Sequence, residues 1–517
     1  MKTSDELLEP SSMPLVQCIE HFRHYTVGVE TSDGPIAMML ERRSRERPDA
    51  LAFAFGAESM TYRQLFDESE RLARLLMAGG LARSDRIALN LPAGLDLVSL
   101  FYAAQRIGAV PCIMDPHVAA PAIERRLASI QPRLVLTAKP PARDVRLSLP
   151  PVFEDRNAPA FLQHTSGTTG EPLAAIVLQR NVVASLHSIR DRIDPRPGDV
   201  LAGWVPPWHD LGLLRFVIFP VFSGLPCHLI PPAVKTIPLW FSEISRVKAT
   251  ITGAPDFAWR LATRLVDPAS VDLRSLRWAT NGGEPVRAST MTAFAERFGV
   301  RNALSPGYGL AEATLGVSSA RPSDDLRVDR WGNVSCGKPL KDVEVRIEDD
   351  QIVVRGPMVF AGYLNAEAAT AETLRDGWLH TGDFGHLDAD GNLYVHGRHR
   401  AMIKRGGRTL APRELEEPAT SVTGVRLAAA VGVPSDLTEE IVLVVEAEPG
   451  LPSIERDVAA AVERAIGFTP DRVLVQAPRT IARTANGKIR HAVVRDQLIS
   501  SRFRSNPRVI SSGLPVR

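Results

Sequence analysis

The chain has 517 residues, 44% hydrophobic and 23% charged, a composition typical of an ordinary water-soluble globular protein. Its length exceeds what one hydrophobic core normally supports, so at least two domains are expected. Sixty-one basic and 59 acidic residues leave a formal charge of +2, which gives no reason to expect nucleic acid or a membrane surface as a partner.

The cysteines and the apolar segments further restrict the class of protein. The four cysteines are far apart and have no paired-ligand spacing, so neither a zinc site nor a disulfide framework is expected. The first residues lack the basic-then-apolar order of a secretory signal. The most apolar stretch, 211–232, is interrupted by Arg215, prolines and a glycine, so it predicts a buried helix followed by a strand rather than a membrane span. A cytoplasmic protein is expected.

Helical and strand patterns alternate from Thr61 onwards. Leucines at helical spacing between Thr61, a plausible N-cap, and Gly79-Gly80, a plausible stop, predict a helix. The segments that follow predict in turn strand 86–91, helix 95–107, strand 110–114, helix 121–130 and strand 134–136. This alternation indicates crossover units and a largely parallel sheet. Five prolines from Lys139 to Pro159 mark a connector.

The alternation resumes after this connector and later gives way to short β segments. The patterns predict a helix after Asn181, strand 200–205, helix 239–247, strand 249–252 and a strand-like 276–279. Sheets of this kind bind ligands beyond the carboxyl ends of their strands. After Gly337, segments 343–347 and 351–354 around Glu348-Asp349-Asp350 predict a hairpin, and strand 393–396 ends at Gly397-Arg398.

We therefore predict an α/β protein with two domains. The large N-terminal domain, 1–399, has mixed, largely parallel sheets flanked by helices plus a β-rich subdomain. The small, mobile α+β C-terminal domain spans 400–500, and 501–517 form a basic tail that is expected to fray.

The chemistry is expected to centre on the loop Gln163-His164-Thr165-Ser166-Gly167-Thr168-Thr169-Gly170-Glu171-Pro172, which follows the strand-like Phe161-Leu162. Such a loop can direct several backbone N–H groups and hydroxyls to one point and bind a phosphate. Composition alone would favour a flexible surface linker over such a site. The loop lacks the Gly-Lys-Ser/Thr ending of the Walker loop, which argues against kinases and motors.

Five further stretches follow this loop in order, and the set resembles the adenylate-forming superfamily of acyl-CoA synthetases, luciferases and adenylation domains. The resemblance extends from the loop to about Arg490. It is carried by Asn281-Gly282-Gly283-Glu284-Pro285, Tyr308-Gly309-Leu310-Ala311-Glu312-Ala313-Thr314, Trp378-Leu379-His380-Thr381-Gly382-Asp383, Tyr394-Val395-His396-Gly397-Arg398 and Arg483-Thr484-Ala485-Asn486-Gly487-Lys488-Ile489-Arg490.

The resemblance implies an ATP site. Gly283 and Glu284 would line the adenine pocket, and Tyr308 and Gly309 would lie beside the base. Thr165 to Gly170 would bind the phosphates. In isolation, a Gly-Gly turn like the one at Gly283 is more often an ordinary turn.

The resemblance also implies where metal and ribose bind. Glu312 would bind Mg²⁺ between the phosphates, although a lone Glu at a helix start is more often a dipole partner. Asp383 would accept both ribose hydroxyls, and Arg398 would contact ribose or phosphate. Arg400 falls at the position where the small domain pivots. Both arginines could equally be solvated surface charges.

Lys488, beside an Asn-Gly turn, matches the lysine that enters the active site in the family. The implied reaction is attack of a substrate carboxylate on the α-phosphorus of ATP, which expels pyrophosphate and leaves an acyl-adenylate. The enzyme would align two anions and stabilise the added charge with Lys488, Mg²⁺ at Glu312 and the donors that begin at Thr165.

Local features most resemble the fatty-acyl-AMP ligases within the superfamily. Leu173 stands where many relatives have a lysine, and these ligases often lack it. The segment Trp204-Val205-Pro206-Pro207-Trp208-His209-Asp210-Leu211-Gly212-Leu213 is similar to their Pro-x-x-His-Asp-x-Gly-Leu pattern, and Thr252 to Ala258 to their acyl-pocket strand end. His209 would border the carboxylate end of the acyl tunnel as a catalytic residue, or be an ordinary packed histidine. The expected substrate contacts are Trp204, His209, Asp210, Asp256, Phe257 and Gly309.

The expected function is activation of a medium or long fatty acid with ATP and Mg²⁺, then transfer to the phosphopantetheine of an acyl carrier protein in a biosynthetic pathway. The compact run 343–379 leaves little room for the insertion that impedes use of CoA, so CoA stays open as acceptor. Asp210 could instead pair with a substrate amine. The alternatives are therefore an acyl-CoA ligase, an amino- or aryl-acid adenylating enzyme, or a silent nucleotide-binding relative, to which the missing lysine gives some weight.

Overall fold

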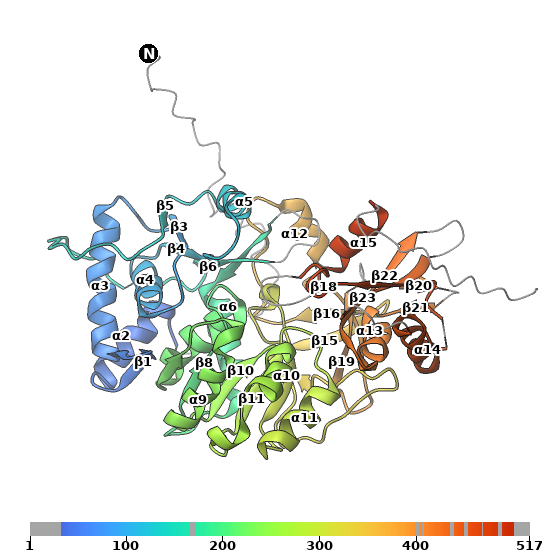
Figure 1. Cartoon of the computed structure of the whole chain (residues 1–517). Coiled ribbons are helices and arrows are strands. Elements are labelled where there is room, and N and C mark those ends of the chain that lie inside the picture. Colours follow the sequence, from blue (N-terminus) through green and yellow to red (C-terminus); the bar gives the residue numbers. More distant parts are fainter. Residues whose placement is uncertain are drawn as a thin grey trace, which may run out of the picture.

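The computed structural model describes residues 33–152, 154–165, 172–398, 403–405, 408–434, 439–448, 453–467, 469–483 and 489–500. Two helix-flanked sheets and a β-rich part occupy the chain up to residue 398, and a smaller unit follows, coloured orange to red (Figure 1). This arrangement confirms the predicted α/β class. The predicted boundary at 399/400 and the tail 501–517 lie outside the described residues.

The first helices form where the sequence patterns predict them. After α2 (Ile36–Glu46), α3 (Tyr62–Ala78) begins at the N-cap Thr61. Thr61 Oγ1 accepts from the backbone N–H of Gln64 at 3.2 Å, and Gln64 Oε1 accepts from Thr61 N at 2.8 Å, a reciprocal capping box. Leu65, Leu72 and Leu76 are buried on one face. The helix ends at Gly79, as predicted.

One five-stranded sheet has the order β5-β3-β4-β6-β7. All its neighbouring strands are parallel except β6 and β7, which confirms the predicted crossover units. Its strands are β3 (Arg86–Leu89), β4 (Val110–Ile113), β5 (Leu134–Leu136), β6 (Pro159–His164) and β7 (Ala174–Leu178). Helices α4 (Leu95–Arg106) and α5 (Ala120–Ile130) connect them.

A nine-stranded sheet has the order β14-β13-β12-β11-β10-β8-β9-β1-β2 and is parallel from β12 to β1. Its strands are β1 (Leu51–Phe55), β2 (Glu58–Thr61), β8 (Leu201–Gly203), β9 (Cys227–Leu229), β10 (Ile251–Ala254), β11 (Trp278–Gly282), β12 (Leu304–Tyr308), β13 (Ser318–Ser319) and β14 (Lys338–Pro339). The helices α6 (Gln179–Ile193), α9 (Ile237–Val247), α10 (Asp256–Leu265) and α11 (Ala288–Phe298) belong to this part.

The structure corrects the end of β11. The pattern predicts a strand over 276–279 with a turn from Asn281, but the strand runs to Gly282. Gly282 pairs with Gly307 of β12, and a Cβ on Gly282 would lie only 2.7 Å from the Gly307 carbonyl oxygen. The close approach that a glycine permits therefore continues the pairing by three residues.

The apolar stretch forms a buried helical segment followed by a strand, as predicted. It consists of α7 (Asp210–Leu213), a π-helical turn η2 (Leu214–Ile218) and α8 (Phe219–Ser223), and it leads into β9. The π turn is not predicted by the sequence pattern, and such turns are frequent at functional sites. None of the helices in the described ranges is long and apolar enough to cross a membrane.

The β-rich part begins with the predicted hairpin. β15 (Glu344–Glu348) pairs with β16 (Gln351–Arg355) in antiparallel register. The two loop residues, Asp349 and Asp350, have φ of +48° and +63°, the conformation that suits a two-residue hairpin. The remaining elements are α12 (Glu367–Thr373), β17 (Leu374–Arg375), β18 (Trp378–Leu387) and β19 (Leu393–Arg398).

The C-terminal unit has apolar cores of its own, separate from the large core of the preceding residues. Its elements are β20 (Ile403–Arg405), β21 (Arg408–Leu410), α13 (Pro412–Ser421), β22 (Val425–Pro434), β23 (Glu439–Ala447), α14 (Ile454–Ile466), β24 (Arg472–Gln476) and α15 (His491–Ile499). It contacts the large part where Arg287 Nε lies 3.5 Å from Glu417 Oε1. The α+β content matches the prediction, whereas its mobility stays a prediction.

Candidate active site

Two predicted nucleotide ligands meet although 75 residues separate them. The Tyr308 hydroxyl, at the end of β12, donates to Asp383 Oδ2 on β18 at 2.6 Å. Asp383 is 6% exposed, and its backbone N–H donates to Thr381 Oγ1 at 3.1 Å. A tyrosine ring and a fixed carboxylate therefore lie side by side, which suits a base and the diol of its ribose.

The predicted Arg398 is the cross-strand partner of Asp383, since β18 and β19 pair these two residues. The pairing brings the predicted ribose acid and the predicted cation to one place on the sheet. The Arg398 side chain itself lies outside the described part of the structure.

Glu312 lies on a single 3₁₀ turn, η5 (Ala311–Ala313), and its carboxylate is held from another part of the chain. The Tyr363 hydroxyl donates to Glu312 Oε1 at 2.7 Å, and Phe360 N donates to the Glu312 carbonyl at 2.9 Å. A carboxylate has about four acceptor sites, so this hydrogen bond orients the group and leaves it able to bind a cation. Sequence reasoning missed Tyr363, because no motif places it near Glu312.

The predicted phosphate loop starts at the tip of the β6–β7 hairpin. β6 extends to His164, and Thr165 N donates to the Leu173 carbonyl at 2.9 Å. The predicted ligands Ser166, Gly167, Thr168, Thr169 and Gly170 lie outside the described residues, as do Arg400 and Lys488.

The base of this loop is fixed by neutral polar contacts. His164 Nε2 lies 3.1 Å from Ser129 Oγ, and its Nδ1 lies 3.4 Å from Cys112 Sγ. Burial, together with the charge of Arg126, lowers the pKa of His164 to about 4, so the imidazole is uncharged near neutral pH. Gln163 Nε2 donates to the Trp208 carbonyl at 2.8 Å, which ties the strand to the His209-Asp210 segment.

A pocket brings together predicted nucleotide and acyl residues. Asp210, Gly283, Tyr308 and Gly309 all line it. Gly309 is fixed by packing, because a Cβ there would lie 1.6 Å from the Leu315 carbonyl oxygen. The pocket is also lined by the apolar side chains of Leu211, Leu315 and Leu340 and by the buried cation Arg215.

Known proteins similar to this chain identify its family. Residues 40–364 match the family of AMP-binding enzymes. The chain belongs to this family. The Mycobacterium tuberculosis protein FadD26, named a long-chain-fatty-acid–AMP ligase, is 27% identical over 582 residues, which cover 92% of this chain and 98% of FadD26. FadD21 of the same organism, whose name assigns it to the fatty-acid–CoA ligases, is also 27% identical, over 91% of this chain and 99% of FadD21.

A solved structure from work on fatty acyl-adenylate ligases of E. coli and L. pneumophila superposes with a TM-score of 0.80 at 26% identity, over 91% of this chain and 98% of that one. The predicted family, and its resemblance to fatty-acyl-AMP ligases, are thereby confirmed. As an AMP-binding enzyme, the protein is an adenylate-forming ligase, a class that uses ATP.

Within this AMP-binding enzyme, the predicted Asp256 and Glu284 hold the backbone around the pocket. Asp256 is 1% exposed and accepts from Asn281 Nδ2 and Arg287 N, each at 3.1 Å, and from Thr290 Oγ1 at 3.0 Å. Burial raises the pKa of Asp256, and these hydrogen bonds oppose the rise. Glu284 Oε1 accepts from the first turn of α10 at Phe257 N, 2.5 Å away. Roles of these two acids in binding stay predictions.

Two predicted acyl contacts lie in an aromatic cluster. The Trp204 ring stacks on Trp240 at 5.4 Å and 14°, and its Nε1 donates to Thr236 Oγ1 at 3.1 Å. Phe257 packs against Trp204 at 6.2 Å. His209, the N-cap of α7, is partly buried. These rings form a wall of the large core, and their contact with a substrate stays a prediction.

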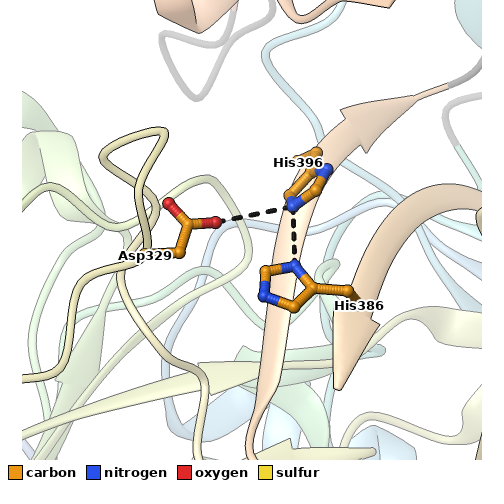
Figure 2. Close-up of side chains that lie close together, drawn as sticks. All are labelled: Asp329, His386 and His396. Carbon is orange, nitrogen blue, oxygen red and sulfur yellow. Dashed lines mark hydrogen bonds and ion pairs between the residues drawn. The ribbon is translucent and has the colours of Figure 1, made fainter. Parts of the chain in front are cut away.

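A second polar cluster lies on β18, β19 and the loop before β14. Figure 2 shows His386 and Asp329 both directed at the His396 ring. His386 Nδ1 is 3.0 Å and Asp329 Oδ2 is 3.5 Å from His396 Nε2. Burial would raise the pKa of Asp329, but hydrogen bonds from His396 and Asn333 lower it to about 2. Two imidazoles and a carboxylate could hold a metal ion such as zinc. Asp329, however, also accepts hydrogen bonds from the backbone N–H groups of Trp331 and Asn333. These bonds account for the cluster as an anchor that holds this loop.

Proposed function

We propose that the protein activates a fatty acid with ATP and passes the acyl group to the phosphopantetheine thiol of an acyl carrier protein. In the first step a carboxylate oxygen of the acid bonds to the α-phosphorus of ATP while pyrophosphate leaves. In the second step the thiol sulfur attacks the acyl carbonyl and AMP leaves with the bonding electron pair. The observation that carries the proposal is the hydrogen bond that Asp383 accepts from Tyr308, a residue that lines the same pocket as Asp210 and Gly309.

The nucleotide would lie with its base beside Tyr308 and Gly283, its ribose hydroxyls donating to Asp383. The donors that begin at Thr165 would hold the phosphates, and Arg398 and Lys488 would supply positive charge. Electrostatic groups fixed in advance stabilise charge that develops during the reaction, and removal of one such donor commonly lowers the rate about 10²-fold or more.

Glu312 fits a magnesium site, since a partly buried carboxylate oriented by Tyr363 is a hard oxygen ligand. When bound there, Mg²⁺ would offset negative charge on the phosphates. Tyr363 keeps the carboxylate in one orientation through its own anchor, because its backbone N–H donates to Thr370 Oγ1 at 2.9 Å.

Leu173 occupies the position of the absent loop lysine and packs against the large core. A leucine side chain offers no positive charge to a phosphate. We therefore expect Lys488 and Arg398 to supply it. Because the cytoplasm supplies ATP and carrier proteins, we expect the protein to act there.

The second candidate function differs from the first in the thiol that accepts the acyl group, which would be CoA in place of a carrier protein. FadD26 is named for acyl-AMP formation and FadD21 for CoA ligation. In the run 343–379, β15, β16, α12 and β17 follow one another up to the start of β18, with the connection 356–366 between β16 and α12. Because it contains no added segment there to restrain the small domain, an acyl-CoA ligase is the alternative that this observation favours.

The test is a mass-spectrometric product analysis of the protein with ATP, Mg²⁺, a panel of fatty, aryl and amino acids, and either CoA or a phosphopantetheinylated carrier protein. Acyl-AMP from an aliphatic acid, with thioester only on the carrier, is the expected result. Acyl-CoA in comparable yield would replace the carrier by CoA, and an amino-acid or aryl adenylate would replace the substrate class. The Lys488→Ala protein should adenylate about 10²-fold more slowly, and an unchanged rate would refute the proposed role of this lysine. A wild-type protein that adenylates no acid would refute the activity itself.

A further inference from the structure

Arg215 is a buried cation inside the pocket. It lies in the π turn η2 and is 7% exposed. Its Nε and Nη1 atoms are both buried and have no hydrogen-bond partner among the described residues. No carboxylate of the described residues forms an ion pair with it, and the Phe219 ring lies beside it, with the ring centroid 5.8 Å from Arg215 Cζ.

A buried guanidinium is normally satisfied by an acceptor, because desolvation of a charge and of its N–H groups is unfavourable. Burial lowers the pKa of Arg215 to about 10, which still leaves the group charged at neutral pH. The paired arginine of the same pocket offers a contrast: Arg192 donates to the carbonyl oxygens of Ser319 and Pro339. Arg215 therefore has donors that a ligand could satisfy.

The pocket connects Arg215 to the site of adenylation. Trp278, Thr280 and Gly282 alternate along β11 and all line the pocket, so one face of that strand forms a wall roughly 13 Å long at about 3.3 Å per residue. Apolar Leu211, Leu315 and Leu340 form other parts of the lining. Such a lining suits a hydrocarbon chain.

Asp210 and Arg215 mark two levels along the helical segment that borders the pocket. They are five residues apart, which corresponds to roughly 7 Å at 1.5 Å per residue. Asp210 belongs to the motif expected at the carboxylate end of the acyl site. The donors of Arg215 therefore lie at a different level of the pocket from the end at which the reacting carboxylate is expected.

We propose that Arg215 binds a second, distal carboxylate of the acyl substrate, so that the enzyme activates aliphatic dicarboxylic acids in preference to simple fatty acids. This inference rests on the proposed adenylation and specifies its substrate class. A guanidinium matches a carboxylate with two parallel N–H···O bonds. An acid that lacks the second carboxylate would leave Arg215 buried and unpaired in the complex, which is the arrangement that gives strong discrimination.

The test compares α,ω-dicarboxylic acids with monocarboxylic acids of the same chain length and with the corresponding monomethyl esters, all measured by acyl-AMP formation. Wild-type enzyme should favour the best dicarboxylic acid by about tenfold to 100-fold in kcat/KM, the range expected for a charge-assisted hydrogen-bonded pair. Arg215→Met should abolish this preference while retaining adenylation of the monocarboxylic acid. Arg215→Lys should retain part of the preference, since a lysine keeps the charge but not the planar pair of donors.

Two further measurements separate binding from folding. Without nucleotide, a dicarboxylic acid should raise the thermal midpoint of wild-type protein but not that of Arg215→Met. The midpoint of the unliganded Arg215→Met protein should be equal to or above that of wild type, because the substitution removes an unpaired buried charge. Arg246→Met, which removes a guanidinium from the exposed face of α9, is the matched control and should behave as wild type.

A wild-type enzyme that prefers monocarboxylic acids would overturn the inference while leaving the proposed adenylation intact. An equal loss of activity towards both acid classes in a folded Arg215→Met protein would also overturn it. Failure of wild-type protein to adenylate any acid would instead overturn the proposed function, and this inference with it.

Discussion

The hydroxyl of Tyr308 donates a 2.6 Å hydrogen bond to the carboxylate of Asp383. The two residues come from different sheets, β12 of the nine-stranded sheet and β18 of the β-rich part. The bond therefore joins two sheets at the place where the nucleotide is proposed to lie, and it holds the carboxylate before any ligand arrives.

Loss of the Asp383 carboxylate should impair use of ATP more than loss of the Tyr308 hydroxyl. Asp383→Ala removes both proposed ribose acceptors and should lower kcat/KM for ATP about 100-fold, corresponding to roughly 3 kcal/mol of charged hydrogen bonds. Tyr308→Phe keeps both acceptors and removes the hydrogen bond that orients them, so it should lower kcat/KM about fivefold to tenfold. Steady-state pyrophosphate release with varied ATP measures both. Equal effects of the two substitutions would contradict the assignment of the ribose to Asp383.

Glu312 and Tyr363 should differ in how they affect the magnesium requirement. Glu312→Gln should lower the adenylation rate at least 100-fold, because a neutral amide is a much poorer ligand for a hard cation. Tyr363→Phe keeps the carboxylate and removes a hydrogen bond that orients it, so the Mg²⁺ concentration for half-maximal rate should change severalfold while the rate at saturating Mg²⁺ stays within about threefold. Mg²⁺ titrations of pyrophosphate release measure this difference. Unaltered Mg²⁺ dependence in both variants would remove Glu312 as the metal ligand.

Asp256 should be important for stability rather than for substrate affinity. Asp256→Ala leaves the donors of Asn281, Arg287 and Thr290 without their acceptor, and should lower the free energy of unfolding by about 3 kcal/mol. Urea unfolding followed by tryptophan fluorescence measures the loss. A higher KM for the acid with unchanged stability would instead support the substrate contact that the sequence motif implies.

His164 should make the protein less stable in mild acid. Its folded pKa of about 4 lies below its ordinary value of 6.5, so between these values the unfolded chain binds a proton that the folded chain does not. The contribution of the uncharged His164 to the free energy of unfolding is therefore fully present above about pH 6.5. It decreases by about 3 kcal/mol as the pH falls towards 4. His164→Gln should remove that part of the decline. Thermal midpoints from pH 7.5 to 4 measure it, and identical curves for the two proteins would show that His164 does not contribute.

Local patterns were sufficient for many of the secondary elements of the large part. The capping residues Thr61 and Gln64, the glycine stop at Gly79 and the Asp349-Asp350 turn act over a few residues, so the elements that they limit can be predicted without the rest of the chain. Ordered motifs likewise indicated the family and the roles of Tyr308, Glu312 and Asp383. The end of β11 was not predictable, because Gly282 continues a strand only where Gly307 of another strand approaches it.

Only the tertiary structure decided which side chains meet. The contacts Tyr363 to Glu312 and Tyr308 to Asp383 join residues 51 and 75 positions apart, and no periodicity determines such pairs. The unsatisfied state of Arg215 is likewise a property of packing, since in sequence it is one charge that interrupts an apolar stretch. The sequence by itself determined many of the elements and the family, and it supplied the candidate residues for adenylation. Packing decided which polar atoms are already paired and which, like those of Arg215, have no partner among the described residues. Burial makes such an unpaired group unfavourable until a partner arrives.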